Sequence, residues 1–167
     1  MKKILIISFI LFFVFSGCAK KEQNITANYS KKLLVNDTQV SVEVVSGSYE
    51  MKKGLSDRDE MCENCGMLFI MPGSSIHYFW MHDMKFPLDF AYIENNKIVE
   101  IFKNVPIYTN NEFTKINSVE NSDMILELNA GFLDKNNIEY IKVVVLYHGG
   151  EPFLNKRLTE FVHAQRN

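Results

Sequence analysis

Two cysteines three positions apart, Cys62 and Cys65 in the segment CENC, have the spacing that points most directly to chemistry. This spacing suits a disulfide, part of a metal site, or a redox dithiol whose thiolate is activated at a helix N-terminus. Thioredoxin-like dithiols lie within a βαβ pattern, and the sequence around this pair has no such pattern. We therefore favour a disulfide first, a metal site second and a redox pair third.

The segment 61–84 that contains these cysteines is rich in soft and imidazole ligands. Its members are Met61, Cys62, Cys65, Met67, Met71, His77, Met81, His82 and Met84. Thioether, thiolate and imidazole groups suit copper(I), and a cysteine pair with histidines is a partial zinc pattern. A copper or zinc site at Cys62, Cys65, His77 and His82 is therefore a hypothesis. We favour core packing for the methionines, since methionine fills irregular gaps, and no other cofactor is indicated.

Several polar or aromatic side chains form a candidate ligand cleft, a set chosen from the family resemblance described below: Arg58, Trp80, Asp83, Asp89 and Glu127. In this hypothesis Trp80 stacks on a ligand and the carboxylates grip it, which would suit a sugar or another small polar molecule of the cell envelope.

Two further interpretations of Asp89 and Glu127 remain open, because both lie between apolar neighbours in the sequence. They could face solvent or pair with Arg58 in a structural network, which we rank first. They could also act as acid and base of a carboxylate-dependent hydrolase, which we rank below a binding cleft. No residue is assigned as catalytic, and the sequence has no nucleophile elbow, phosphate-binding glycine loop or HExxH motif.

The amino terminus has the pattern of an export signal. Lys2 and Lys3 precede an apolar run of 12 residues, 4–15, which is too short to span a bilayer. The run ends in FSGC, which resembles the lipobox of bacterial lipoproteins. That resemblance implies removal of residues 1–17, a diacylglycerol and palmitate-type acyl chains on Cys18, and anchoring on the extracytoplasmic side of a membrane. The alternative is an ordinary secretory signal with a chance cysteine.

Composition favours one small globular domain in an oxidising compartment. After cleavage 150 residues remain, with 16 basic and 20 acidic side chains and a formal charge of −4. This length suits one domain, and the charge does not favour nucleic acid as a partner. An extracytoplasmic location also favours a disulfide between the two remaining cysteines. We expect a binding or accessory module whose partner is a small molecule or an envelope protein.

Short apolar segments bounded by turn residues predict a mainly β fold. We expect strands at 40–44, 66–71, 77–81, 88–94, 98–102, 124–128 and 141–147. Asn95 and Asn96 predict a hairpin, because asparagine tolerates left-handed backbone angles. These strands predict a small antiparallel sandwich or barrel-like domain with one or two short helices.

Helical spacing is weaker and confined to three segments. We expect helical structure at 48–58, a helical turn at 130–137, and a short amphipathic helix in the tail through Leu154, Leu158, Phe161 and Val162. The expected organisation is a signal peptide at 1–17, a lipidated and flexible tether at 18–37, a β domain at 38–148 and a tail at 149–167.

Five blocks, taken together and in order, resemble domain-of-unknown-function family 192. They are Lys53-Gly54-Leu55 with Arg58, Gly66-Met67-Leu68-Phe69, Phe79-Trp80-Met81, Pro87-Leu88-Asp89, and Leu126-Glu127-Leu128 with Gly131. The resemblance covers about residues 40–146 and implies a compact β-sandwich-like fold, often exported or lipid-anchored, without a settled activity. The family usually has Asn and a small hydroxyl residue where this chain has Asp83 and Met84, and the cysteine pair is not part of its pattern.

A Cys18→Ser substitution should abolish incorporation of labelled palmitate and release the protein from the membrane fraction. The sulfur of Cys18 would carry the acyl chains, and each buried methylene contributes about 0.8 kcal/mol to anchoring. Metabolic labelling followed by membrane fractionation measures both effects. Label that persists in Cys18→Ser, or mature protein that retains Met1, would contradict the lipoprotein hypothesis.

Overall fold

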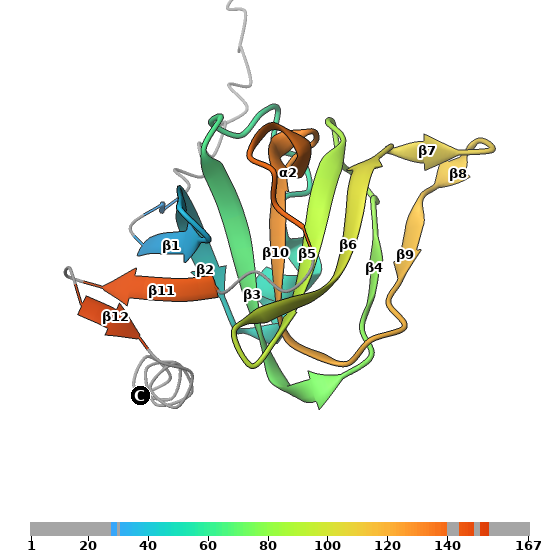
Figure 1. Cartoon of the computed structure of the whole chain (residues 1–167). Coiled ribbons are helices and arrows are strands. Elements are labelled where there is room, and N and C mark those ends of the chain that lie inside the picture. Colours follow the sequence, from blue (N-terminus) through green and yellow to red (C-terminus); the bar gives the residue numbers. More distant parts are fainter. Residues whose placement is uncertain (1–27, 30, 140–143, 149–150, 154–167) are drawn as a thin grey trace, which may run out of the picture.

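The computed structural model describes residues 28–29, 31–139, 144–148 and 151–153 (Figure 1). The strands are β1 (Lys31–Val35), β2 (Thr38–Val45), β3 (Cys65–Ser75), β4 (Tyr78–Trp80), β5 (Leu88–Glu94), β6 (Lys97–Val105), β7 (Tyr108–Thr109), β8 (Glu112–Phe113), β9 (Lys115–Asn117), β10 (Ser122–Asn129), β11 (Val144–His148) and β12 (Glu151–Phe153). The helices are α1 (Ser48–Lys53) and α2 (Phe132–Lys135). The predicted mainly β class with two short helices is confirmed. Within these residues, neither helix has the length and apolarity to cross a membrane.

Eight of the described strands form one sheet in the order β12-β11-β1-β2-β3-β10-β5-β6. Its strands pair antiparallel except for β2 and β3, which run parallel. A parallel pair needs a crossover, and residues 46–64, which include α1, provide it. The described strands form no closed barrel, so the barrel alternative is wrong. Two small antiparallel pairs, β4 with β9 and β7 with β8, are drawn to the right of β6 in Figure 1, and Phe79 of β4 packs against Phe69 and Phe90 of the sheet.

Hydrophobic clusters cover both faces of the central strands. Along β10, Met124, Leu126 and Leu128 join the cluster that contains α2, whereas Ile125 joins the opposite cluster. The opposite cluster is completed by the crossover and by β4 and β9. Because both faces are covered, β3, β5 and β10 are nearly continuous apolar runs rather than alternating ones.

Asparagines close the tight hairpins of this domain. Asn95 and Asn96 have φ values of 50° and 64° between β5 and β6, so the predicted hairpin is confirmed. Asn110 and Asn111 have φ values of 53° and 65° between β7 and β8. Two consecutive left-handed residues are the backbone pattern of a type I′ turn. The second hairpin was not predicted, since its strands contain only two residues each.

Helix α1 ends earlier than the sequence predicts. We expected helical structure through residue 58, but the helix stops at Lys53. Gly54 has a φ of +50°, and its N–H donates to the Glu50 carbonyl, so the backbone turns away from the helix axis at this residue. Glycine adopts this left-handed conformation without the strain that a Cβ would cause.

Both ends of the domain extend beyond the predicted boundaries. Strand β1 lies inside the 18–37 range assigned to the tether, because Leu33 and Val35 alternate with less buried residues and are themselves buried. Strand β12 occupies 151–153, where the tail was expected to begin a helix. The apolar residues of that helix (Leu154, Leu158, Phe161, Val162) lie outside the described residues, as do the signal peptide and Cys18.

Asp89 is a structural carboxylate that joins three elements. It is fully buried on β5 and accepts hydrogen bonds from the backbone N–H groups of Asn104 at 2.7 Å and Leu133 at 2.9 Å. Asn104 belongs to β6, and Leu133 lies in the first turn of α2, where helical N–H groups have no partner within the helix. A carboxyl group is tolerated at this buried position because these donors replace water.

Asp89→Ala should lower the free energy of unfolding by about 3 kcal/mol, because two buried N–H groups lose a charged acceptor. Asp89→Asn should lower it less, since one acceptor oxygen remains. Urea unfolding measures both variants. The exposed Glu112→Gln is the matched control and should change the free energy by less than about 0.5 kcal/mol. Equal stability of Asp89→Ala and wild type would contradict this role.

Candidate functional site

Asp89 and Glu127 lie on opposite faces of the sheet. In the pairing of β10 with β5, Glu127 is opposite Phe90, and Asp89 is opposite Leu128. Directly opposed residues share a face, and consecutive residues on a strand alternate between faces. Asp89 therefore faces α2, and Glu127 faces the crossover. The structure does not bring the two carboxylates together, so the hypothesised acid–base pair is not formed.

Glu127 lines a cavity of about 40 Å³ between the end of α1 and strand β4. The remaining lining residues are Met51, Lys52, Lys53, Gly54, Leu55, Ser56, Phe69, Phe79, Trp80 and Met84. Of the five cleft residues suggested by the sequence, the structure brings Trp80 and Glu127 to this cavity. It places Arg58, Asp83 and Asp89 elsewhere.

The carboxyl group of Glu127 is buried without full hydrogen bonding. Only 6% of the residue is exposed, and its Oε2 has no hydrogen-bond partner among the described residues. Burial raises the pKa of Glu127 to about 8, and the positive charge of Arg58 acts in the opposite direction. A carboxyl group in an apolar site favours its neutral form, because the anion loses its hydration. At neutral pH this residue is therefore mostly protonated.

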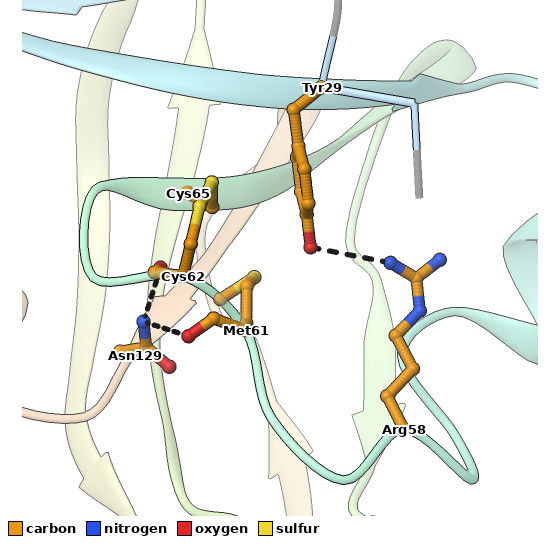
Figure 2. Close-up of a disulfide and its surroundings, with 6 residues drawn as sticks. All are labelled: Tyr29, Arg58, Met61, Cys62, Cys65 and Asn129. Carbon is orange, nitrogen blue, oxygen red and sulfur yellow. Dashed lines mark hydrogen bonds between the residues drawn. A yellow bond between two sulfur atoms is a disulfide. The ribbon is translucent and has the colours of Figure 1, made fainter. Parts of the chain in front are cut away.

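Arg58 pairs with a carboxylate that the sequence analysis did not identify. Its Nη2 donates to Oε2 of Glu43 at 2.9 Å, and its Nη1 donates to the hydroxyl of Tyr29 at 3.5 Å; Figure 2 shows the contact with Tyr29. Glu43 on β2 is paired with Met67 on β3, and Met67 is paired with Glu127 on β10. The signal for Glu43 was its place in the alternating segment Val42-Glu43-Val44, which was interpreted only as strand patterning.

Contacts between residues 54–57, which follow α1 and are called the α1 turn, and the segment after β4 hold the wall of the cavity. The hydroxyl of Ser56 donates to the His82 carbonyl at 3.0 Å, and the N–H of Asp57 donates to the Asp83 carbonyl at 2.8 Å. The Asp83 carboxylate lies 2.8 Å from Nδ1 of His82. Asp83 thus positions the turn through its backbone and does not line the cavity.

Strand β4 directs alternate aromatic rings to opposite sides. Phe79 packs inward with its ring centroid 5.1 Å from that of Phe69, whereas Trp80 is 54% exposed beside the cavity. Trp80 stacks on His82 at 4.7 Å, and His82 packs on Phe113 at 4.6 Å. The stacking holds the indole in place while more than half of its surface stays accessible.

Cys62 and Cys65 form a disulfide at the start of β3, as the preferred hypothesis states (Figure 2). Asn129 on β10 donates to the carbonyls of Met61 at 3.3 Å and Cys62 at 2.9 Å, and Figure 2 shows both bonds. The disulfide and this side chain together fix the end of the crossover against the central sheet.

The hypothesised metal ligands are not assembled in the part of the chain that the structure describes. Those residues contain no group of three or more His, Cys, Asp or Glu side chains placed to hold a metal ion. His77 contacts the Ser75 hydroxyl and the Ser122 carbonyl, and His82 contacts Asp83. Most of the methionines of this segment are buried in the cluster on the Glu127 face, where they fill the core.

Comparisons with known proteins agree with this fold. The model of the DUF192 family, described as an uncharacterized ACR, matches residues 31–145. A crystal structure from Sinorhizobium meliloti 1021, named as a "putative transcription regulator", is 25% identical with a TM-score of 0.62, covering 70% of this chain and 93% of that one. A protein of unknown function from Novosphingobium aromaticivorans DSM 12444 is 24% identical with a TM-score of 0.61, covering 68% and 82%. No curated protein matches the chain.

Glu127→Gln should remove a pH dependence of stability. The pKa of Glu127 is raised from 4.5 to about 8 in the folded state, so the unfolded chain releases this proton first as the pH rises. Wild type should therefore lose stability relative to Glu127→Gln between about pH 5 and pH 8, by up to about 1.4 kcal/mol per pH unit. Urea unfolding across this range measures the difference. Parallel curves for the two proteins would contradict the raised pKa.

Proposed function

The chain belongs to the DUF192 family, and we propose that it is a binding module of the cell envelope, anchored through a lipid on Cys18. The short apolar leader that ends in FSGC supports export and lipidation. The disulfide between Cys62 and Cys65 supports the same compartment, because disulfides persist mainly in oxidising environments outside the cytosol.

We place the binding site at the cavity beside Glu127 and Trp80, hereafter the Glu127 cleft. The observation that carries this proposal is the buried Oε2 of Glu127, which has no hydrogen-bond partner among the described residues. An unsatisfied buried polar group costs about 1–3 kcal/mol, and a ligand group that bonds to it recovers part of that cost. The exposed indole of Trp80 supplies a flat apolar surface next to this polar group.

The size of the cavity limits what can enter. A volume of about 40 Å³ exceeds the roughly 10–15 Å³ that one water molecule needs, but it is far below that of typical ligand pockets, at about 300–1,000 Å³. One small polar group of a ligand can therefore enter and reach Glu127. The body of the ligand would remain outside, against Trp80.

Binding is better supported than hydrolysis. A hydrolase of the hypothesised kind needs a second carboxylate across the substrate, and Asp89 is held on the other face by two backbone N–H groups. The hydroxyl of Ser56 donates to a backbone carbonyl and so is not activated by a base. The Glu127 cleft thus has one acidic group, two lysines and an aromatic surface, a combination that suits a polar ligand.

Trp80→Ala should weaken ligand binding at least tenfold while changing the melting temperature by no more than a few degrees. The indole is more than half exposed, so its removal costs little core packing. A thermal-shift screen of sugars, amino acids and amines would identify a ligand, and calorimetry would compare the variants. Tyr49→Ala is a matched control, because Tyr49 is 75% exposed and does not line the cavity. Unchanged affinity in Trp80→Ala, or a collapse of its stability, would contradict the proposal.

A further inference from the structure

The charges around the Glu127 cleft do not balance once Glu127 ionises. Arg58 is the cation that acts on Glu127, but its guanidinium is already paired with Glu43 at 2.9 Å. Among the described residues, Glu127 has no ion pair of its own, and no side chain or backbone group donates to its Oε2. The ionised carboxylate would therefore be a buried negative charge without a direct partner, which is costly in an apolar site.

Lys52 and Lys53 line the cleft as well, but its aromatic and thioether side chains suit a cation as the missing partner of Glu127. Three aromatic side chains (Phe69, Phe79 and Trp80) and two thioethers (Met51 and Met84) form most of its apolar wall. Aromatic rings and sulfur are polarisable, and aromatic side chains are the usual surroundings of organic ammonium groups in proteins. An anion would oppose ionisation of Glu127, and a neutral hydroxyl would leave the residue protonated, so a cation is the partner that can pair with the ionised carboxylate.

From this arrangement we propose that the Glu127 cleft binds the primary ammonium group of a small organic amine, with the carboxylate of Glu127 as its counterion and Trp80 against the body of the ligand. This inference rests on the proposed binding function and names its ligand class. The cavity of about 40 Å³ admits an ammonium group but not a whole sugar ring or a side chain of an aromatic amino acid.

Binding should release a proton, because the resting carboxyl group is mostly neutral. Burial raises the pKa of Glu127 to about 8, so at pH 7 an incoming ammonium group must displace the proton. Below about pH 8 the affinity should increase nearly tenfold for each pH unit. Above that pH it should level off, and it should fall again as the amine loses its own charge, near pH 10 for an alkyl amine.

Other ionisable groups near Glu127 do not account for this change of affinity with pH. On β5 the hydroxyl of Tyr92 is buried, and burial with the nearby charges of Glu100 and Glu127 raises its pKa, so Tyr92 stays neutral over this range. On β2 Glu43 is the ion-pair partner of Arg58. On α1 the exposed Lys52 and the partly buried Lys53 also line the cleft, and neither forms an ion pair with Glu127 among the described residues.

The test uses the purified full-length chain and the fluorescence of Trp80, which is its one tryptophan. Benzylamine is titrated at pH 6–9 beside benzyl alcohol, which has the same ring and a neutral hydroxyl. We expect benzylamine to bind at least tenfold more tightly than benzyl alcohol at pH 8.5, with the pH dependence described above. Glu127→Gln should remove both the preference for the amine and the dependence on pH, whereas the exposed Glu112→Gln should behave as wild type.

A second measurement needs no variant. Calorimetry of benzylamine binding at pH 7, in two buffers with different ionisation enthalpies, should show release of about one proton per amine bound. Equal affinity for the amine and the alcohol, or binding without proton release, would overturn the ammonium inference. If another compound binds in a Trp80-dependent manner while benzylamine does not, the proposed binding function stands and this inference fails. If no compound binds in that manner, both fail.

Discussion

Burial of both faces of the central strands governs how the acidic residues of this domain can be accommodated. Because β3, β10 and β5 are covered by one hydrophobic cluster on each side, a carboxylate on any of them is removed from water whichever way it points. A buried carboxylate needs hydrogen-bond donors, a counterion or a proton. Asp89 and Glu127, on neighbouring strands, meet this requirement in different ways.

The difference between these two acids follows from what covers each face. On the α2 face, the backbone of β6 and the first turn of the helix present N–H groups that bond to both oxygens of Asp89. On the opposite face, the crossover presents apolar side chains and an arginine that is already paired, so Glu127 retains its proton. The first acid is therefore part of the framework, and the second is available to a ligand.

The crossover between the parallel strands β2 and β3 builds the wall around Glu127. It is tied to the sheet at several points: the Arg58–Glu43 ion pair, the disulfide, the bonds from Asn129, and the contacts of Ser56 and Asp57 with the segment after β4. Apart from the disulfide these ties are individually modest, since partly exposed ion pairs and hydrogen bonds contribute about 1 kcal/mol each. Together they hold the α1 turn and Trp80 on either side of a small cavity.

Local patterns in the sequence predicted the β class and the Asn95-Asn96 hairpin, because each depends on neighbouring residues. The spacing of the two cysteines and the expected compartment ranked a disulfide above a metal site and a redox pair. The family resemblance singled out Trp80 and Glu127, which lie in its Phe79-Trp80-Met81 and Leu126-Glu127-Leu128 blocks. Only the tertiary structure decided which residues meet. The register of β10 with β5 sets Asp89 and Glu127 on opposite faces, and the parallel pairing of β2 with β3 aligns Glu43 with Met67, next to Glu127. Such alignments join residues that are 24 to 60 positions apart, and no spacing along the chain encodes them.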